Sequence, residues 1–251
     1  MSETISAPLV DHLLELRRRL IYVLGGFLIA FMVSYHFSDE IFALLVKPLA
    51  NVLEGKMGRR LIYTGLAEAF MTYLKVALFT ATFITLPFFA IQVWLFISPG
   101  LFPVEKKVLL PFLISTPLFF GLGATFAYYF IIPPAWKFFL AFEETKASHI
   151  LPIQLEARVS EYLAIVMQLI LAFGTSFLLP VLLILLGRIG IITSQALATK
   201  RKYAFLLILI VAAIVTPPDV LSMIGLAFPL YFLYETSIFC VYFFEKRGSH
   251  A

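Results

Sequence analysis

Six long apolar blocks, separated by short polar stretches, constrain the fold of this chain more than any other feature. They cover residues 20–37, 70–97, 110–140, 162–186, 203–215 and 220–244. A helix needs about 20 residues to cross the hydrocarbon core of a bilayer. The blocks therefore predict an all-α polytopic membrane protein with six transmembrane helices. The fifth block has only 13 residues, and a helix of that length spans about 20 Å, too short to cross an ordinary core unaided.

The amino-acid composition agrees with this class. Hydrophobic residues make up 61% of the chain and charged residues only 14%, whereas a soluble domain has roughly 45–50% and about 25%. The 27 Phe and 11 Tyr residues suit lipid and its interface with water. The net charge of +4 belongs to the loops and does not indicate binding of nucleic acid. The single cysteine, Cys240, has no internal disulfide partner and lies in an apolar run as a small hydrophobe.

The distribution of charge predicts the orientation in the membrane. Six crossings place both termini on one side, where the polar stretches carry eleven basic residues: Arg17, Arg18, Arg19, Lys106, Lys107, Arg188, Lys200, Arg201, Lys202, Lys246 and Arg247. The opposite side carries seven in longer loops: Lys47, Lys56, Arg59, Arg60, Lys137, Lys146 and Arg158. Because Lys and Arg in short loops stay in the cytosol, both termini are predicted to be cytosolic.

The stretch Asp11–Leu20, just before the first block, has the spacing of an amphipathic helix. Three of its leucines share one face, and Glu15 precedes Arg19 by four residues, the favourable order for a helical ion pair. Such a helix can lie along a membrane surface with its charged face toward the cytosol. The simpler interpretation is an anchor in which Arg17–Arg19 only orient the next helix. That interpretation leaves the acid Glu15 unexplained.

Prolines predict where the helices end or bend. Between the first two blocks lies a short amphipathic piece, Ile41–Val46, which we expect Pro48 to end. The third block contains the pair Pro133–Pro134 and is expected to tilt or kink. The fourth contains Gln168 and Pro180.

Several motifs, in this order, are similar to those of the TatC family, whose members are the receptor subunits of the twin-arginine protein translocase. They are HLLELRRRL at His12–Leu20, LAEAF at Leu66–Phe70 with Lys75, QVWLFISP at Gln92–Pro99 followed by Glu105, FAY at Phe126–Tyr128, AFG at Ala172–Gly174, and TPPD at Thr216–Asp219. The resemblance runs from His12 to about Glu235. It implies a concave bundle of six helices with cytosolic termini and short fifth and sixth helices, forming one integral membrane domain over residues 1–251.

The resemblance also implies a binding patch for signal peptides that carry paired arginines. In this family the patch is formed by the N-terminal segment and the first cytosolic loop, and the matching positions are Glu15, Arg17, Phe96, Pro99 and Glu105. A guanidinium offers planar paired donors, so two carboxylates can recognise two arginines in a way that lysines do not fully imitate. Glu15 and Glu105 converge if the first and second membrane helices pack together. The alternative for Glu105 is a surface acid paired with Lys106 or Lys107, an interaction worth only about 0–1 kcal/mol.

Four further residues are candidates for assembly or transport: Pro48, Gln168, Asp219 and Glu235. An ionisable residue within a membrane segment is a functional candidate by default, yet Glu235 is equally open to structural pairing near the cytosolic interface. Asp219 is alternatively a turn-forming residue, and Pro48 matches a position that fixes the shape of its loop. The chain departs from the family at Leu178, where many relatives carry a polar residue. This departure argues against a carboxylate in the fourth helix as the anchor for a partner helix.

The implied function is that of a signal-peptide receptor and core subunit, which exports folded proteins across the bacterial cytoplasmic (inner) membrane using the proton-motive force. The implied partners are twin-arginine signal peptides, TatA- and TatB-type single-helix subunits, other TatC copies and membrane lipid. The sequence has no GxxxxGK[ST] loop, catalytic triad or metal motif, so it predicts a non-enzyme without a cofactor. The alternative, a small-solute transporter, usually shows internal repeats, and none is evident here.

Overall fold

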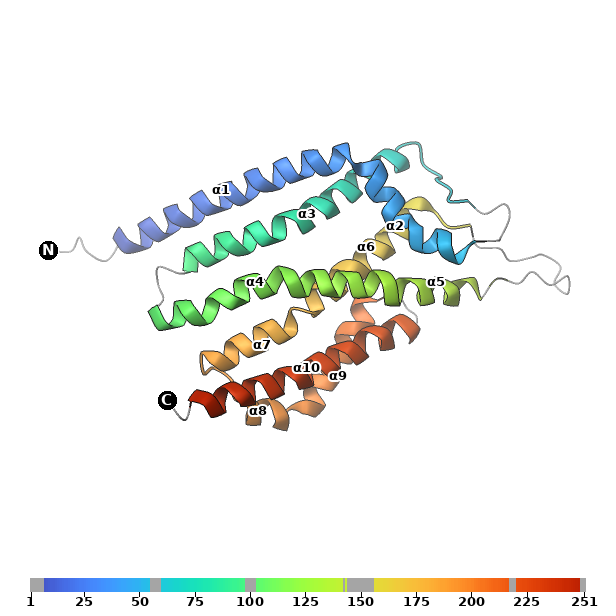
Figure 1. Cartoon of the computed structure of the whole chain (residues 1–251). Coiled ribbons are helices and arrows are strands. Elements are labelled where there is room, and N and C mark those ends of the chain that lie inside the picture. Colours follow the sequence, from blue (N-terminus) through green and yellow to red (C-terminus); the bar gives the residue numbers. More distant parts are fainter. Residues whose placement is uncertain are drawn as a thin grey trace.

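The computed structural model describes residues 7–54, 60–97, 103–141, 143, 156–216 and 220–248, without the side chains of residues 7–9, 97, 103–110, 221 and 247–248. Within these ranges the chain is a bundle of helices (Figure 1). The elements in chain order are α1 (Ala7–His36), α2 (Ser38–Val52), α3 (Glu68–Ile97), α4 (Pro103–Phe126), the π-helical turn η2 (Ala127–Ile131), α5 (Ile132–Leu140), α6 (Val159–Ser176), α7 (Leu179–Arg188), α8 (Ser194–Thr199), α9 (Arg201–Val215) and α10 (Val220–Gly248).

Four helical runs in the described part are long and apolar enough to cross a membrane: Glu68–Phe96, Pro111–Leu140, Val159–Arg188 and Ser222–Lys246. The pair α1 and α2 meets the same test only when both are taken together, and they are bent by 74°. With 15 residues, α9 is short, as the fifth block predicted. The expectation of a short sixth helix is wrong, because α10 continues for 29 residues. The helix continues through Pro229, which lies inside α10 without ending it.

The stretch Asp11–Leu20 is the beginning of α1 and not a separate surface helix, because α1 is continuous from Ala7 to His36. The stretch Asp11–Leu20 contains no proline, and its charged residues lie among strong helix formers. In Figure 1, α1 begins, α3 ends, α4 begins and α10 ends on the same side of the bundle. We call this side the terminal end.

Pro48 does not end its helix, contrary to the sequence-based expectation; α2 continues through it to Val52. A proline lacks the N–H that would bond the carbonyl four residues earlier, here that of Leu44. The hydroxyl of Tyr128 donates to this carbonyl at 2.7 Å, and the hydroxyl of Tyr162 donates to the neighbouring Leu45 carbonyl at 2.8 Å. The helix therefore tolerates Pro48 because the Tyr128 hydroxyl from η2 replaces the missing backbone donor, while Tyr162 from α6 bonds the next carbonyl.

This arrangement predicts the effect of removing one hydroxyl. Replacing Tyr128 with phenylalanine leaves the Leu44 carbonyl without its donor and should destabilise the protein by about 1 kcal/mol. The measurement is reversible unfolding in detergent followed by circular dichroism. Tyr129→Phe is the matched control, because its side chain is 65% exposed. Equal stability of the two variants would contradict the role assigned to the Tyr128 hydroxyl.

The third apolar block is one helical run, Pro111–Leu140, whose winding changes next to the proline pair. The α-helical pattern of α4 loosens into η2 just before the pair Pro133–Pro134, which stands in the first turn of α5. Widening the backbone by one residue is a common way to accommodate a bend in a helix. In the fourth block, Pro180 lies in the first turn of α7, after a break at Phe177 and Leu178.

The core lies where α5, α6 and α10 meet, and its fully buried side chains include Ile132, Leu163, Phe173 and Leu226. The helices α4 and α6 approach each other closely at Gly123. A Cβ built on Gly123 would lie 2.4 Å from the carbonyl oxygen of Phe173. Small residues allow helix backbones to come this close in membrane proteins.

Glu68 connects the polar segments at the end of the bundle opposite the terminal end. One carboxylate oxygen accepts from the backbone N–H groups of Thr64 at 2.9 Å and Gly65 at 3.2 Å, and from the guanidinium of Arg158 at 3.3 Å. The other accepts from the hydroxyl of Ser160 at 2.5 Å and from its N–H at 3.3 Å. Glu68 therefore satisfies donors ahead of α3 and at the start of α6 with a single carboxylate.

Candidate functional site

The terminal end of the bundle brings the start of α1 against the end of α3, the packing that the sequence analysis required for its candidate patch. The helices α1 and α3 pack along each other, and α3 also packs on α4 (Figure 1). The first and second membrane helices therefore do adjoin.

Glu15 is held in place by Arg19, as their spacing in the sequence predicted. Both Nε and NH2 of Arg19 donate to the same oxygen of Glu15, Oε1, at 3.0 and 2.5 Å. The remaining nitrogen of Arg19, NH1, donates to Oε1 of Gln92 on α3 at 3.4 Å. The Glu15 side chain is 32% exposed and that of Arg19 is 20% exposed, so the carboxylate is fixed but accessible.

Phe96 lies in the last turn of α3 and stacks on His12 of α1. The two ring centroids are 4.2 Å apart and the planes differ by 20°. His12, Glu15 and Arg19 occur at i, i+3 and i+7 and therefore share one face of α1. Gln92 and Phe96, four residues apart, likewise share one face of α3.

The other members of the predicted patch are placed less completely. Arg17 is exposed on α1. Glu105 belongs to the first turn of α4, but its side chain lies outside the described set, and Pro99 lies outside the described residues. The convergence of Glu15 and Glu105 therefore stays a prediction.

Of the residues that were candidates for assembly or transport, two make direct polar contacts. Glu235 forms a two-pronged ion pair with Arg201, with Nε–Oε1 and NH2–Oε2 distances of 2.8 Å. Gln168 donates to the carbonyl of Val215 at 2.8 Å. Val215 is the last residue of α9, and the last carbonyls of a helix have no donor within the helix. Both contacts hold helices together, the structural alternative that was open for Glu235. Asp219 lies outside the described residues, and Pro48 is buried in α2.

A second polar cluster at the terminal end fixes the connection between α7 and α9. The carboxylate of Glu245 on α10 accepts from the N–H of Ser194 at 2.9 Å and from its hydroxyl. The guanidinium of Arg188 lies 4.1 Å from the centroid of the Phe244 ring. The sequence analysis missed this cluster, although an acid placed after a long apolar run was a usable signal.

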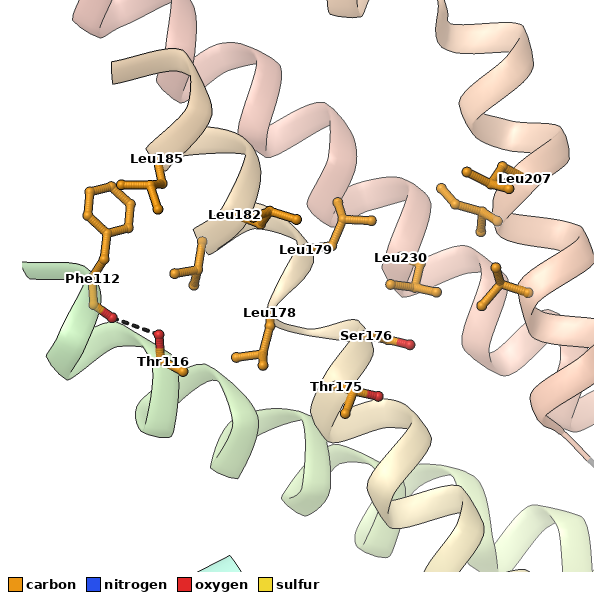
Figure 2. Close-up of a pocket in the computed structure, with 13 residues that line it drawn as sticks. Phe112, Thr116, Thr175, Ser176, Leu178, Leu179, Leu182, Leu185, Leu207 and Leu230 are labelled. Atoms are coloured by element: carbon orange, nitrogen blue, oxygen red, sulfur yellow. Dashed lines mark hydrogen bonds between the residues drawn. The ribbon is translucent and has the colours of Figure 1, made fainter. Parts of the chain in front are cut away.

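An apolar groove of about 570 Å³ opens beside the break between α6 and α7. Figure 2 shows Leu178 at this break, Phe112 and Thr116 on the neighbouring helix α4, and Leu207 and Leu230 across the groove on α9 and α10. The hydroxyls of Thr116 and Thr175 are both bonded to carbonyls of their own helices. Apart from the ring of Phe112 and the hydroxyl of Ser176, the described lining therefore presents aliphatic side chains, and it contains no charged group.

The described residues contain no group of three His, Cys, Asp or Glu side chains that could hold a metal ion.

Comparison with known proteins gives a consistent family. The family model of the Sec-independent protein translocase protein (TatC) matches residues 11–229. The chain belongs to the TatC family. The TatC protein of Rickettsia prowazekii is 48% identical over 94% of this chain and 92% of its own length. That of Escherichia coli K12 is 34% identical over 99% of this chain and 93% of its own length.

A solved structure agrees with these sequence matches. The crystal structure of the twin-arginine translocase receptor TatC in the detergent DDM has a TM-score of 0.75 and 35% identity, and it covers 91% of this chain and 98% of the other. The chain is thus a multi-pass membrane protein of a protein-transport family. The region matched by the family model includes Glu15, Phe96, Glu105 and Leu178, while Glu235 lies beyond it.

Proposed function

We propose that this TatC-family chain is the signal-peptide receptor and core subunit of a twin-arginine translocase, which exports folded proteins using the proton-motive force. The observation that carries the proposal is the Glu15 carboxylate, fixed yet accessible at the terminal end beside the stacked ring of Phe96. The family match and the similarity to a TatC receptor structure support it.

The chemistry of this end suits paired arginines. A guanidinium donates planar, paired hydrogen bonds to a carboxylate and also stacks on aromatic faces. An ammonium group can match the charge but not this geometry. Glu15 and Phe96 provide the carboxylate and the aromatic face, and Glu105 on α4 is the second acid we assign to the patch, together with Arg17 and Pro99.

The groove beside Leu178 is the surface we assign to the apolar part of the signal peptide and to single-helix partners of the TatA and TatB type. Its described lining is mostly aliphatic and carries no charge, so binding there depends on shape and dispersion rather than on a buried charge. Because Leu178 offers no carboxylate that could anchor a partner helix, we assign apolar contacts to this surface. Other TatC copies and membrane lipid are the remaining partners, and Pro48, Gln168, Asp219 and Glu235 support assembly.

The proposed location is the bacterial cytoplasmic membrane with both termini in the cytosol and six crossings, formed by α1, α3, α4 to α5, α6 to α7, α9 and α10. The excess of basic residues in the short loops on the side of the termini supports this orientation. We assign no enzymatic reaction and no cofactor to the chain.

The test uses the full chain together with its partner subunits in membranes. A photo-crosslinking probe at position 14, on the exposed part of α1, is combined with a signal peptide bearing Arg-Arg or Lys-Lys. We expect the crosslink to fall at least tenfold with Lys-Lys and with Glu15→Gln, because a charged hydrogen-bonded pair is worth about 1.5–3 kcal/mol.

Asp11→Asn is the matched control, since it removes one negative charge from the same exposed helical stretch. It should leave the crosslink within twofold of the wild-type chain. A crosslink that is indifferent to Lys-Lys and to Glu15→Gln would show that this stretch only orients the first helix.

A further inference from the structure

Two contacts between α1 and α3 bracket Glu15. On one side, His12 stacks on Phe96 at 4.2 Å. On the other, Arg19 reaches Gln92 at 3.4 Å. Because the α1 residues share a face and the α3 residues share a face, the two contacts act as rungs between the helices, with Glu15 placed on α1 between them.

The way Arg19 holds Glu15 leaves half of the carboxylate available. Arg19 directs Nε and NH2 to the single oxygen Oε1. Oε2 of Glu15 makes no hydrogen bond among the described residues, and the side chain is 32% exposed. Oε1 therefore already holds two donors, whereas Oε2 keeps its capacity to accept.

We propose that Arg19, supported by Gln92, is a positioning residue for recognition of the signal peptide: it fixes Glu15 so that Oε2 points to the ligand beside the His12–Phe96 stack. The ligand at this subsite is one guanidinium, bound by Oε2 and by the aromatic faces. This inference rests on the proposed function and adds the residues that prepare the site for arginine.

Arg19 is also a potential competitor, because it is itself a guanidinium on the same carboxylate. Two considerations favour positioning. On Glu15, Arg19 donates only to Oε1, so a ligand that binds Oε2 does not have to displace Arg19. A free glutamate side chain, in contrast, loses rotamer freedom when it binds a ligand, and fixing it in advance removes that cost.

The test measures the affinity of labelled Arg-Arg and Lys-Lys signal peptides for the complete receptor complex in membranes. With Arg19→Gln we expect affinity for the Arg-Arg peptide to fall about tenfold and affinity for the Lys-Lys peptide to fall less than twofold. The ratio between the two affinities therefore falls at least fivefold. Gln92→Ala should act in the same direction but more weakly, about threefold on the Arg-Arg peptide.

Arg18→Gln is the matched control, because it removes the same charge from an exposed neighbouring position and should leave the ratio within twofold. An increased affinity for Arg-Arg in Arg19→Gln would show that Arg19 competes for Glu15. An equal loss for both peptides would show a structural role only. Both results overturn the inference, as would an Arg19→Gln variant that behaves like Arg18→Gln.

The inference and the proposed function fail in different ways. If the wild-type complex does not distinguish the two peptides and Glu15→Gln has no effect, the proposed function is wrong. If the wild-type complex distinguishes them through Glu15 while Arg19→Gln and Gln92→Ala leave the ratio unchanged, only the positioning role is wrong.

Discussion

Replacing Gly123 with alanine should destabilise the protein by about 3 kcal/mol, the upper part of the range for an overpacked core. The new Cβ would lie 2.4 Å from the carbonyl oxygen of Phe173, 2.9 Å from its carbonyl carbon and 2.9 Å from Cβ of Phe177. Two of these atoms belong to the backbone and cannot move aside as a flexible side chain would. The helices α4 and α6 must separate, which exposes the fully buried ring of Phe173.

The matched control for this prediction is on the same helix. A Cβ built on Gly121 would meet no obstructing atom within 4 Å. Alanine also stabilises a helix by up to about 1 kcal/mol relative to glycine. Unfolding in detergent should therefore show Gly121→Ala equal to or more stable than wild type, and Gly123→Ala far less stable. Similar stabilities would contradict the close approach of α4 and α6.

Replacing Glu68 with glutamine should loosen the end of the bundle opposite the terminal end and lower the melting temperature in detergent by about 5 °C. Glu68 receives hydrogen bonds from Thr64, Gly65, Arg158 and Ser160. A glutamine keeps one acceptor oxygen and puts an NH2 group in place of the other, where it faces donors. The N–H groups ahead of α3 or at the start of α6 then lose their acceptor.

Hydrogen exchange gives a local measurement of the same change. The N–H of Ile62 donates to the carbonyl of Ala157 at 3.1 Å, and the N–H of Val159 donates to the carbonyl of Ile62 at 2.9 Å. Both amides should exchange faster in Glu68→Gln. This local effect separates opening of the two polar segments from a general loss of stability.

Glu161→Gln is the control for Glu68→Gln because it changes the same charge and touches the same arginine. Glu161 pairs with Arg158 at 2.9 Å, but its side chain is 66% exposed, whereas that of Glu68 is 8% exposed. Exposed pairs contribute little, so the control should melt like wild type. Equal melting temperatures for the two variants would show that Glu68 is not the connection between the segments.

Several features were readable from the sequence because they depend on local composition and spacing. Apolar length predicted a helical membrane protein, and the 13-residue block predicted the short α9. The four-residue spacing of Glu15 and Arg19 predicted their ion pair. The ordered motifs from His12 onward indicated the TatC family, which the family model and the relatives confirm.

Other features depended on tertiary contacts that no local pattern encodes. Pro48 was expected to end its helix, yet Tyr128, 84 residues from Leu44, supplies a donor to the freed carbonyl. Glu68 meets Ser160 across 92 residues, and Gln92 meets Arg19 across 73.

The sequence by itself therefore determined the class of the protein, its family and the acid around which its receptor surface is predicted. Hydrophobicity and helical spacing act over a few neighbouring residues, so they are visible in any window of the chain. Only the tertiary structure decided which polar groups satisfy each other, because a buried carbonyl or carboxylate takes its partner from whichever helix packs beside it. Gln92, which accepts from the remaining nitrogen of Arg19, reaches it only because α3 packs on α1.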